Sequence, residues 1–239
     1  MNKEKLNIYR NDNTILNDSF DQAVMNIHIQ VEQHGYKTFV ICGCEAGDGA
    51  TTTAINLAAA FALAGIKTVL IDGDMRKKKA YKHLNESTAE GLSNYLRYLC
   101  DLEDIIYETT TDNLSYIPCG ELINNPLRTL CSTKMSSLKK ELEDEFDLVI
   151  YDMPAINAAM DAKMIAVKAD AVILVSSMNK TSKKGLISAA NTLSDAKINL
   201  IGTIINKVSM DEYKRYRKDY DYFDDEKYVK KFKKARRHE

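Results

Sequence analysis

The sequence predicts an α/β fold: a doubly wound, mostly parallel sheet with helices on both faces. Short, continuously apolar runs recur along the chain, as in strands that are buried on both sides. Segments with helical spacing of apolar residues separate these runs, and alternating elements of this length imply right-handed crossovers. The 239 residues suffice for one such domain with a buried core.

The expected elements follow in order along the chain. The first is a helix over residues 18–35, which ends at Gly35. Strands are expected at 37–43, 67–74, 114–120, 147–154, 170–177 and 199–208. Helices are expected between them at 51–65, 89–96, 127–146, 160–169 and 183–196. Since no linker or repeat divides this pattern, we expect one domain over 18–208, an N-terminal arm over 1–17 and a tail over 209–239.

The composition is that of an ordinary globular protein and excludes several classes. The chain is 45% hydrophobic and 28% charged, and its net charge of -1 indicates no nucleic-acid partner. No apolar stretch approaches the roughly 20 residues of a membrane span, and the polar N-terminus lacks the apolar core of a signal peptide. Five scattered cysteines without metal-site spacing fit a reducing compartment. We therefore expect a cytoplasmic protein.

The last thirty residues differ from the rest of the chain. They combine charges of both signs with few aliphatic residues, so they are expected to form a mobile tail. The tail carries five tyrosines: Tyr213, Tyr216, Tyr220, Tyr222 and Tyr228. Its final stretch, KYVKKFKKARR, is basic and aromatic; docking on anionic lipid is one interpretation, and a solvated basic tail is the other.

The stretch CEAGDGATTT, residues 44–53, lies between a predicted strand and a predicted helix. It follows the spacing of the phosphate-binding loop G-x-x-x-x-G-K-[ST], except that Cys44 replaces the first glycine and Ala50 the lysine. Glycines allow such a loop to turn its N–H groups toward a phosphate. By itself, the stretch is equally consistent with a plain turn. The candidate nucleotide-binding residues here are Gly47, Asp48, Gly49, Ala50, Thr51 and Thr52.

Acidic residues end two further predicted strands. VLIDGDMR places Asp72 and Asp74 after the second strand, and LVIYDMP places Asp152 after another. Ligands of open parallel sheets bind at the carboxyl ends of the strands. Carboxylates there can hold Mg²⁺ through water or accept a proton from a hydroxyl. The three strand ends together predict a nucleotide and magnesium site.

With these motifs the chain resembles the bacterial tyrosine kinases (BY-kinases), in particular the stand-alone cytoplasmic kinases of capsule and exopolysaccharide operons in Gram-positive bacteria. The resemblance runs from about residue 15 to the end of the chain. It rests on the Walker-A-like CEAGDGATTTAINLA, the Walker A′ motif VLIDGDMR, GLSNYL, the Walker B motif LVIYDMP, GELINNPLRTL and the tyrosine cluster. It implies a P-loop NTPase-type fold that uses ATP and Mg²⁺ to phosphorylate tyrosines, including those in each other's tails.

The resemblance also implies roles for individual residues. The backbone of 47–51 would hold the ATP phosphates, and Asn206 would contact adenine or simply close its strand. Asp72 would be the base or orienter for the tyrosine hydroxyl, while Thr51, Asp74 and Asp152 would position Mg²⁺. The five tail tyrosines would be phosphoacceptors. The implied partners are protein tyrosine substrates and a membrane adaptor of the polysaccharide co-polymerase type, which would recruit the chain to the inner face of the plasma membrane.

Three features depart from the family pattern. Ala50 removes the lysine that bridges the β- and γ-phosphates. The N-terminal E-x-x-R-x-x-R motif, which packs against a neighbouring subunit, is replaced by Asp18, Asp21 and Val24, so homo-oligomerisation is in doubt. The proline-rich loop carries Ile123 and Asn124 before its Asn-Pro pair.

Ala50 has three explanations that the sequence leaves open. The chain is a natural pseudokinase that acts as a regulatory scaffold, it carries an engineered lysine-to-alanine substitution, or it keeps weak activity because another cation, such as Lys77 to Lys79, replaces the lysine. A rival family is the ParA/MinD-type ATPases, whose loop carries a second lysine where this chain has Glu45. The tyrosine-rich tail is not part of that pattern.

Overall fold

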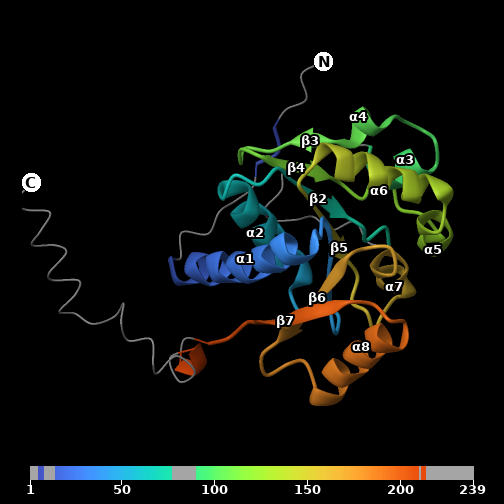
Figure 1. Ribbon diagram of the computed structural model, residues 1–239. Helices are drawn as coiled ribbons and strands as arrows, with labels where there is room; N and C mark the ends of the chain where they lie inside the picture. Colours follow the sequence, from blue (N-terminus) through green and yellow to red (C-terminus); the bar gives the residue numbers. More distant parts are fainter. Residues whose placement is uncertain (1–4, 8–13, 77–89, 210, 214–239) are drawn as a thin grey trace, which may run out of the picture. The chain divides into compact units, whose positions relative to one another are not determined.

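The computed structural model describes residues 5–7, 14–76, 90–209 and 211–213. Figure 1 labels the elements. In chain order they are α1 (Thr14–His34), β1 (Thr38–Gly43), α2 (Ala50–Leu63), β2 (Thr68–Asp72), α3 (Leu92–Leu96), α4 (Leu102–Ile105), β3 (Tyr107–Glu108), β4 (Leu114–Ile117), α5 (Pro126–Leu130), α6 (Thr133–Glu145), β5 (Leu148–Met153), α7 (Met160–Ala166), β6 (Ala171–Ser177), α8 (Lys183–Asp195) and β7 (Leu200–Asn206).

The strands form one seven-stranded sheet in the order β3-β4-β2-β5-β1-β6-β7. Every neighbouring pair is parallel except β3 and β4, which are antiparallel. Strand β1 therefore lies inside the sheet, between β5 and β6, and later strands are added on both sides of it. The predicted doubly wound, mostly parallel α/β fold is confirmed.

Each face of the sheet has its own hydrophobic core. Alternate residues of a strand point to opposite faces, so Val40 and Cys42 of β1 belong to one core and Phe39 and Ile41 to the other. Helices α1 and α2 cover the second face, whereas α3, α5, α6, α7 and α8 contribute to the core of the first; Figure 1 shows α1 and α2 together on one side. All residues of β1, β2, β5 and β6 are buried, which explains their continuously apolar sequences.

The structure corrects several expected element boundaries. The helix expected over 127–146 is two helices, because Ser132 caps α6 by accepting a hydrogen bond from the Met135 N–H at 3.3 Å. Helix α1 begins at Thr14, four residues before the predicted start. The short elements α4 and β3 were not predicted, since four and two residues are too few for a periodic pattern.

The contacts within the chain separate Met1–Asn206 from Lys207–Glu239. In the second unit, Ser209 and Glu212 form a reciprocal cap: the Ser209 N–H donates to Glu212 Oε2 at 3.1 Å, and the Glu212 N–H donates to Ser209 Oγ at 3.3 Å. Residues 211–213, including Tyr213, are helical. The other four tail tyrosines and Lys77 to Lys79 lie outside the described residues. None of the described helices is long and apolar enough to cross a membrane.

Candidate functional site

The carboxyl ends of three central strands meet at one edge of the sheet. Asp72 at the end of β2 is the register partner of Asp152 in β5, and Ile41 of β1 is the register partner of Asp152 on the other side. Two backbone hydrogen bonds, each 2.9 Å long, hold the segments beyond the strands together: the Gly73 N–H donates to the Asp152 carbonyl, and the Ile156 N–H donates to the Gly43 carbonyl. The sequence therefore places its acidic strand ends beside the glycine loop.

The loop after β1 has the backbone conformation that its glycines allow. Gly47 and Gly49 have φ angles of +82° and +90°, in the region that side chains disfavour. Helix α2 begins directly afterwards at Ala50, and among the described residues no side chain caps it at Gly49. The first turn of a helix attracts anions through its N–H groups and dipole. A phosphate at this position would take the place of a side-chain cap.

Asp48 has a structural role in the loop. Its side chain is buried, its Oδ2 accepts a hydrogen bond from the Glu45 N–H, and its Oδ1 accepts one from the Thr181 hydroxyl, both at 2.8 Å. Its carbonyl accepts a hydrogen bond from the side-chain amide of Asn206 at 2.9 Å. Asp48 thus ties the loop to the turn after β6 and to the end of β7.

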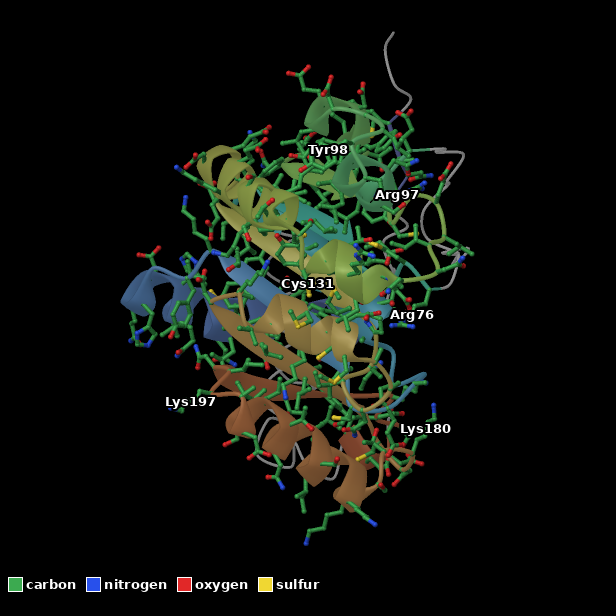
Figure 2. All side chains as sticks on the ribbon, turned by 90° about the vertical axis from the view of Figure 1, so that its right-hand side faces the viewer. Arg76, Arg97, Tyr98, Cys131, Lys180 and Lys197 are labelled. Carbon is green, nitrogen blue, oxygen red and sulfur yellow. The ribbon has the colours of Figure 1, made fainter. Side chains whose placement is uncertain are left out.

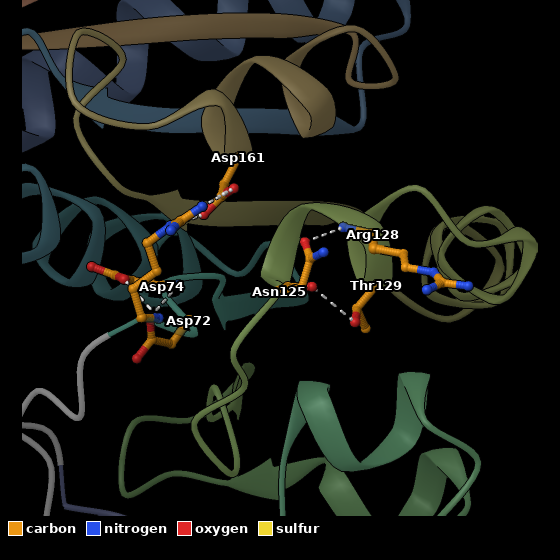
Figure 3. A network of polar contacts seen from close by, with 7 residues as sticks. Asp72, Asp74, Asn125, Arg128, Thr129 and Asp161 are labelled. Carbon is orange, nitrogen blue, oxygen red and sulfur yellow. Dashed lines mark hydrogen bonds and ion pairs between the residues drawn. The ribbon is translucent and has the colours of Figure 1, made fainter.

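The three predicted carboxylates are all buried at the strand ends: Asp72, Asp74 and Asp152 are 2%, 7% and 2% exposed. Asp72 Oδ1 accepts a hydrogen bond from the Asp74 N–H at 3.0 Å, and Asp74 Oδ1 accepts one from the Arg76 N–H at 3.2 Å. These contacts fix the turn after β2. Figure 3 shows Asp72 and Asp74 close together, with Asp161 nearby on a neighbouring helix.

Arg76 and Asp161 form a two-pronged ion pair beside these carboxylates. The guanidinium donates from Nε and Nη2 to the two carboxylate oxygens at 2.6 and 2.9 Å. The Asp161 side chain is fully buried at the start of α7, and the Arg76 side chain is 47% exposed. The hydrogen bond from Asp161 raises the pKa of Arg76 above its ordinary value. The sequence did not single out Asp161, because an acid in the first turn of a helix is common.

A cavity of about 410 Å³ opens between these elements. Its lining includes the predicted residues Gly47, Asp48, Gly49, Ala50, Thr51 and Asp74, together with Arg76 and the segment after β5. Small residues form the wall opposite the loop: Pro154, Ala155, Ala158 and Ala159. A glycine-lined concavity at a helix N-terminus, with Arg76 and acidic side chains in its lining, fits the phosphates of a nucleotide.

The donor set at the cavity also fits a magnesium ion that is bound mainly through phosphates. Within the described residues no group of three His, Cys, Asp or Glu side chains is arranged to hold a metal by itself. Mg²⁺ is usually held by one or two carboxylates plus substrate phosphates and water. Thr51 and Asp74 line the cavity, and Asp152 lies one residue before its wall.

Comparison with known proteins identifies the family. The AAA domain family matches residues 36–207. Tyrosine-protein kinase CpsD of Streptococcus agalactiae serotype Ia is 33% identical over 183 residues, which are 76% of this chain and 79% of that protein. The chain belongs to the bacterial tyrosine-protein kinase family. Another relative in this family is the putative tyrosine-protein kinase CapB of Staphylococcus aureus, which is 28% identical over 84% of this chain and 88% of its own length.

Solved structures of BY-kinases share the fold. The chimerical protein CapA2B2 superposes with a TM-score of 0.76 at 28% identity, covering 80% of this chain and 84% of that one. The kinase domain of the Escherichia coli tyrosine kinase ETK gives 0.73 at 25% identity, over 80% and 78% of the two chains. MinD of Pyrococcus horikoshii, at 22% identity and a TM-score of 0.59 over 71% and 69% of the chains, shares the fold alone.

Four of the predicted catalytic, metal and nucleotide residues of this BY-kinase homologue are not among the cavity's lining residues: Asp72, Asp152, Thr52 and Asn206. Thr52 is exposed on α2, and its carbonyl accepts a hydrogen bond from the Asn56 side chain at 2.7 Å. Asn206 reaches the loop through the Asp48 carbonyl but is not among the cavity's lining residues. Its contact with adenine remains a prediction, as does the phosphorylation of the tail tyrosines.

Proposed function

We propose that this chain binds MgATP in the cavity at the end of β1 and transfers the γ-phosphoryl group to protein tyrosines, including those of its own tail. The observation that carries the proposal is the meeting of the glycine loop, Thr51 and Asp74 around one cavity, with Asp72 and Asp152 buried at the adjoining strand ends. Phosphoryl transfer requires positioning and charge neutralisation more than covalent chemistry. The site contains groups of both kinds.

In this proposal, each residue of the site has a role in phosphoryl transfer that follows from its position. The backbone of 47–51 holds the phosphates, while Thr51, Asp74 and Asp152 hold the magnesium ion, which neutralises phosphate charge when it is bound. Asp72 orients the tyrosine hydroxyl and accepts its proton. Its Oδ1 is held by the Asp74 N–H, so the carboxylate keeps a fixed orientation for this task. Asn206 contacts the base from the end of β7.

Ala50 lowers the rate of transfer in this proposal. A lysine at that position places a positive charge where negative charge develops in the transition state, and removing one such contact costs about 10²-fold or more in rate. The alternative function, a pseudokinase that binds nucleotide and acts as a scaffold, is favoured by the same residue. A ParA/MinD-type ATPase is disfavoured, because Glu45 has a carboxylate where those proteins carry a lysine.

The biological setting follows from the family resemblance. We infer a role in the synthesis and export of capsular polysaccharide or exopolysaccharide, with a membrane adaptor of the polysaccharide co-polymerase type as activating partner. The adaptor would bring the chain to the inner face of the plasma membrane. Self-association is weakened in this proposal, because Asp18, Asp21 and Val24 stand where relatives carry the interface motif.

The test restores the missing charge. MgATP affinity by calorimetry and phosphotyrosine formation are measured for the unaltered chain, Ala50→Lys and Ala50→Met, the last adding a similar chain without the charge. We expect all three to bind MgATP, and only Ala50→Lys to form phosphotyrosine about 10²-fold faster than the unaltered chain. If all three chains bind MgATP and none of them forms phosphotyrosine, the pseudokinase function is supported instead. Absence of nucleotide binding in all three would overturn the proposal.

A further inference from the structure

A lysine from a distant part of the chain lies against the phosphate loop. Lys180 belongs to the turn between β6 and α8, and its Nζ donates a hydrogen bond to the Ala46 carbonyl at 2.9 Å. The same ammonium covers Gly47 so closely that an added Cβ there would lie 2.6 Å from Nζ. The loop that lacks a lysine at position 50 therefore has one beside its outer wall.

Neighbouring contacts fix the origin of this side chain. Thr181 donates its hydroxyl to Asp48 Oδ1 at 2.8 Å and accepts a hydrogen bond from the Ser177 N–H at 2.7 Å. Ser182 donates its hydroxyl to Glu45 Oε1 at 3.3 Å. Three successive residues of the turn thus contact three residues of the loop, so the backbone of Lys180 is held in register with the loop.

The charge of Lys180 is not neutralised in the way that the other nearby cation is. The guanidinium of Arg76 is bound to both oxygens of the buried Asp161. Lys180 contacts a neutral carbonyl, and in the part of the chain that the structure describes no carboxylate lies within ion-pair distance of its ammonium. Figure 2 shows both cations, Arg76 and Lys180, on the right-hand side of the molecule. An ammonium gains more from a phosphate oxygen than from a carbonyl, since the bond is then charge-assisted on both sides.

We propose that Lys180 binds the polyphosphate of the nucleotide and supplies the positive charge that Ala50 does not. On binding, the ammonium leaves the Ala46 carbonyl and takes a phosphate oxygen at the adjacent loop, by rotation about its side-chain bonds. This inference rests on the proposed nucleotide site. It assigns a role to a residue that the phosphate-loop motif does not include, and it identifies a described residue as the substitute cation in place of Lys77 to Lys79.

Calorimetric titration of the full chain with MgATP, ADP and AMP tests the assignment. We expect Lys180→Gln to weaken MgATP binding about tenfold or more, because a charge-assisted phosphate contact is lost, and to change AMP binding less than twofold. Lys180→Arg should keep most of the affinity. The matched control is Lys184→Gln, which removes another exposed lysine, one with no polar contact to the loop in the described residues. The control should bind as the unaltered chain does.

A second substitution tests whether the two positions are equivalent. In the Lys180→Gln background, Ala50→Lys should restore MgATP affinity, since either lysine then serves the same phosphates. Unchanged MgATP affinity in Lys180→Gln overturns the inference while leaving the nucleotide site intact. The inference is also overturned if Lys180→Gln loses as much affinity for AMP as for MgATP, because that result would indicate a structural role of the turn. If the unaltered chain and Ala50→Lys both fail to bind any nucleotide, the proposed function itself is overturned.

Discussion

The two flanks of the phosphate loop are built from different chemistry. On the side of β2, β5 and α7, buried carboxylates and Arg76 are held by charge-assisted contacts. On the side of β6 and β7, hydroxyls, an amide and a lysine hold the loop through Thr181, Asn206 and Lys180. The first flank has the charged groups of a reaction centre. The second flank holds the loop in place, and we call its residues Asp48, Thr181, Lys180 and Asn206, together with Glu45, the brace. The difference predicts that the proposed reaction chemistry and the shape of the loop depend on different residues.

The first flank should be the more sensitive in stability. Removing Arg76 by Arg76→Ala leaves the fully buried Asp161 carboxylate without its ion-pair partner. We expect a loss of about 2–3 kcal/mol, below the figure for a wholly buried pair because the arginine is half exposed. Urea denaturation measures the loss. The control, Arg97→Ala, removes one partner of the exposed pair with Glu121 and should cost less than about 0.5 kcal/mol.

A second variant separates the buried charge from the lost packing. Replacing both partners, with Arg76→Met and Asp161→Leu, removes the unpaired carboxylate and should recover much of the stability that Arg76→Ala loses. Equal losses in Arg76→Ala and Arg97→Ala would contradict the comparison, because the buried position of Asp161 would then have no energetic consequence.

The second flank should respond to the loss of Asp48. Asp48→Ala removes acceptors from the Glu45 N–H and the Thr181 hydroxyl. We expect about 1–2 kcal/mol of destabilisation and a tenfold or greater loss of MgATP affinity, because the loop loses its tie to β6. Denaturation and calorimetry measure the two effects. Thr181→Val breaks one of these bonds and should give a smaller loss of both; a larger effect than that of Asp48→Ala would contradict the role of Asp48 as the shared acceptor.

The sequence predicted the fold because its strands are buried on both faces and therefore continuously apolar, as β1 and β5 show. It did not predict β3, whose two residues pair with β4 through tertiary context rather than through a pattern of their own. The sequence also did not predict the break between α5 and α6. Ser132 acts as a cap only because the chain turns there, and the same residue is tolerated inside a helix.

The site was predicted to the extent that strand ends determine it. Asp72 and Asp152 lie at the carboxyl ends of neighbouring parallel strands, so their proximity follows from topology. Asp161 and Lys180 come from a helix start and a turn, and their approach to the site depends on how those segments pack. The hydrogen bonds that the Asp48 side chain accepts from Glu45 and Thr181 were not predicted either, because a loop motif alone does not tell which groups a carboxylate contacts.

The last expected effect is confined to alkaline pH and concerns Cys44, the first residue of the loop. Cys44 is fully buried, and burial together with the charges of Asp48 and Glu45 raises the pKa of its thiol from 9.0 to about 11. Between these two values the unfolded chain loses this proton and the folded chain keeps it. Stability should therefore fall as pH rises from about 9 to 11, by about 2–3 kcal/mol from this group, since one pKa unit corresponds to about 1.4 kcal/mol. Below pH 9 its contribution is fully present.

Cys44→Ala isolates this contribution, since burial also raises the pKa of Cys42 and Tyr151. Thermal melts at intervals between pH 8 and pH 11 should show a shallower decline for the variant than for the unaltered chain. Asp48→Asn removes one of the two charges that raise the pKa of the Cys44 thiol, so the folded-state pKa moves toward 9.0. The decline should then end at a lower pH, and the total loss of stability should be smaller than in the unaltered chain. An unchanged slope in Cys44→Ala would assign the alkaline loss to Cys42 and Tyr151, and would mean that the acidic charges of the brace do not reach the start of the loop.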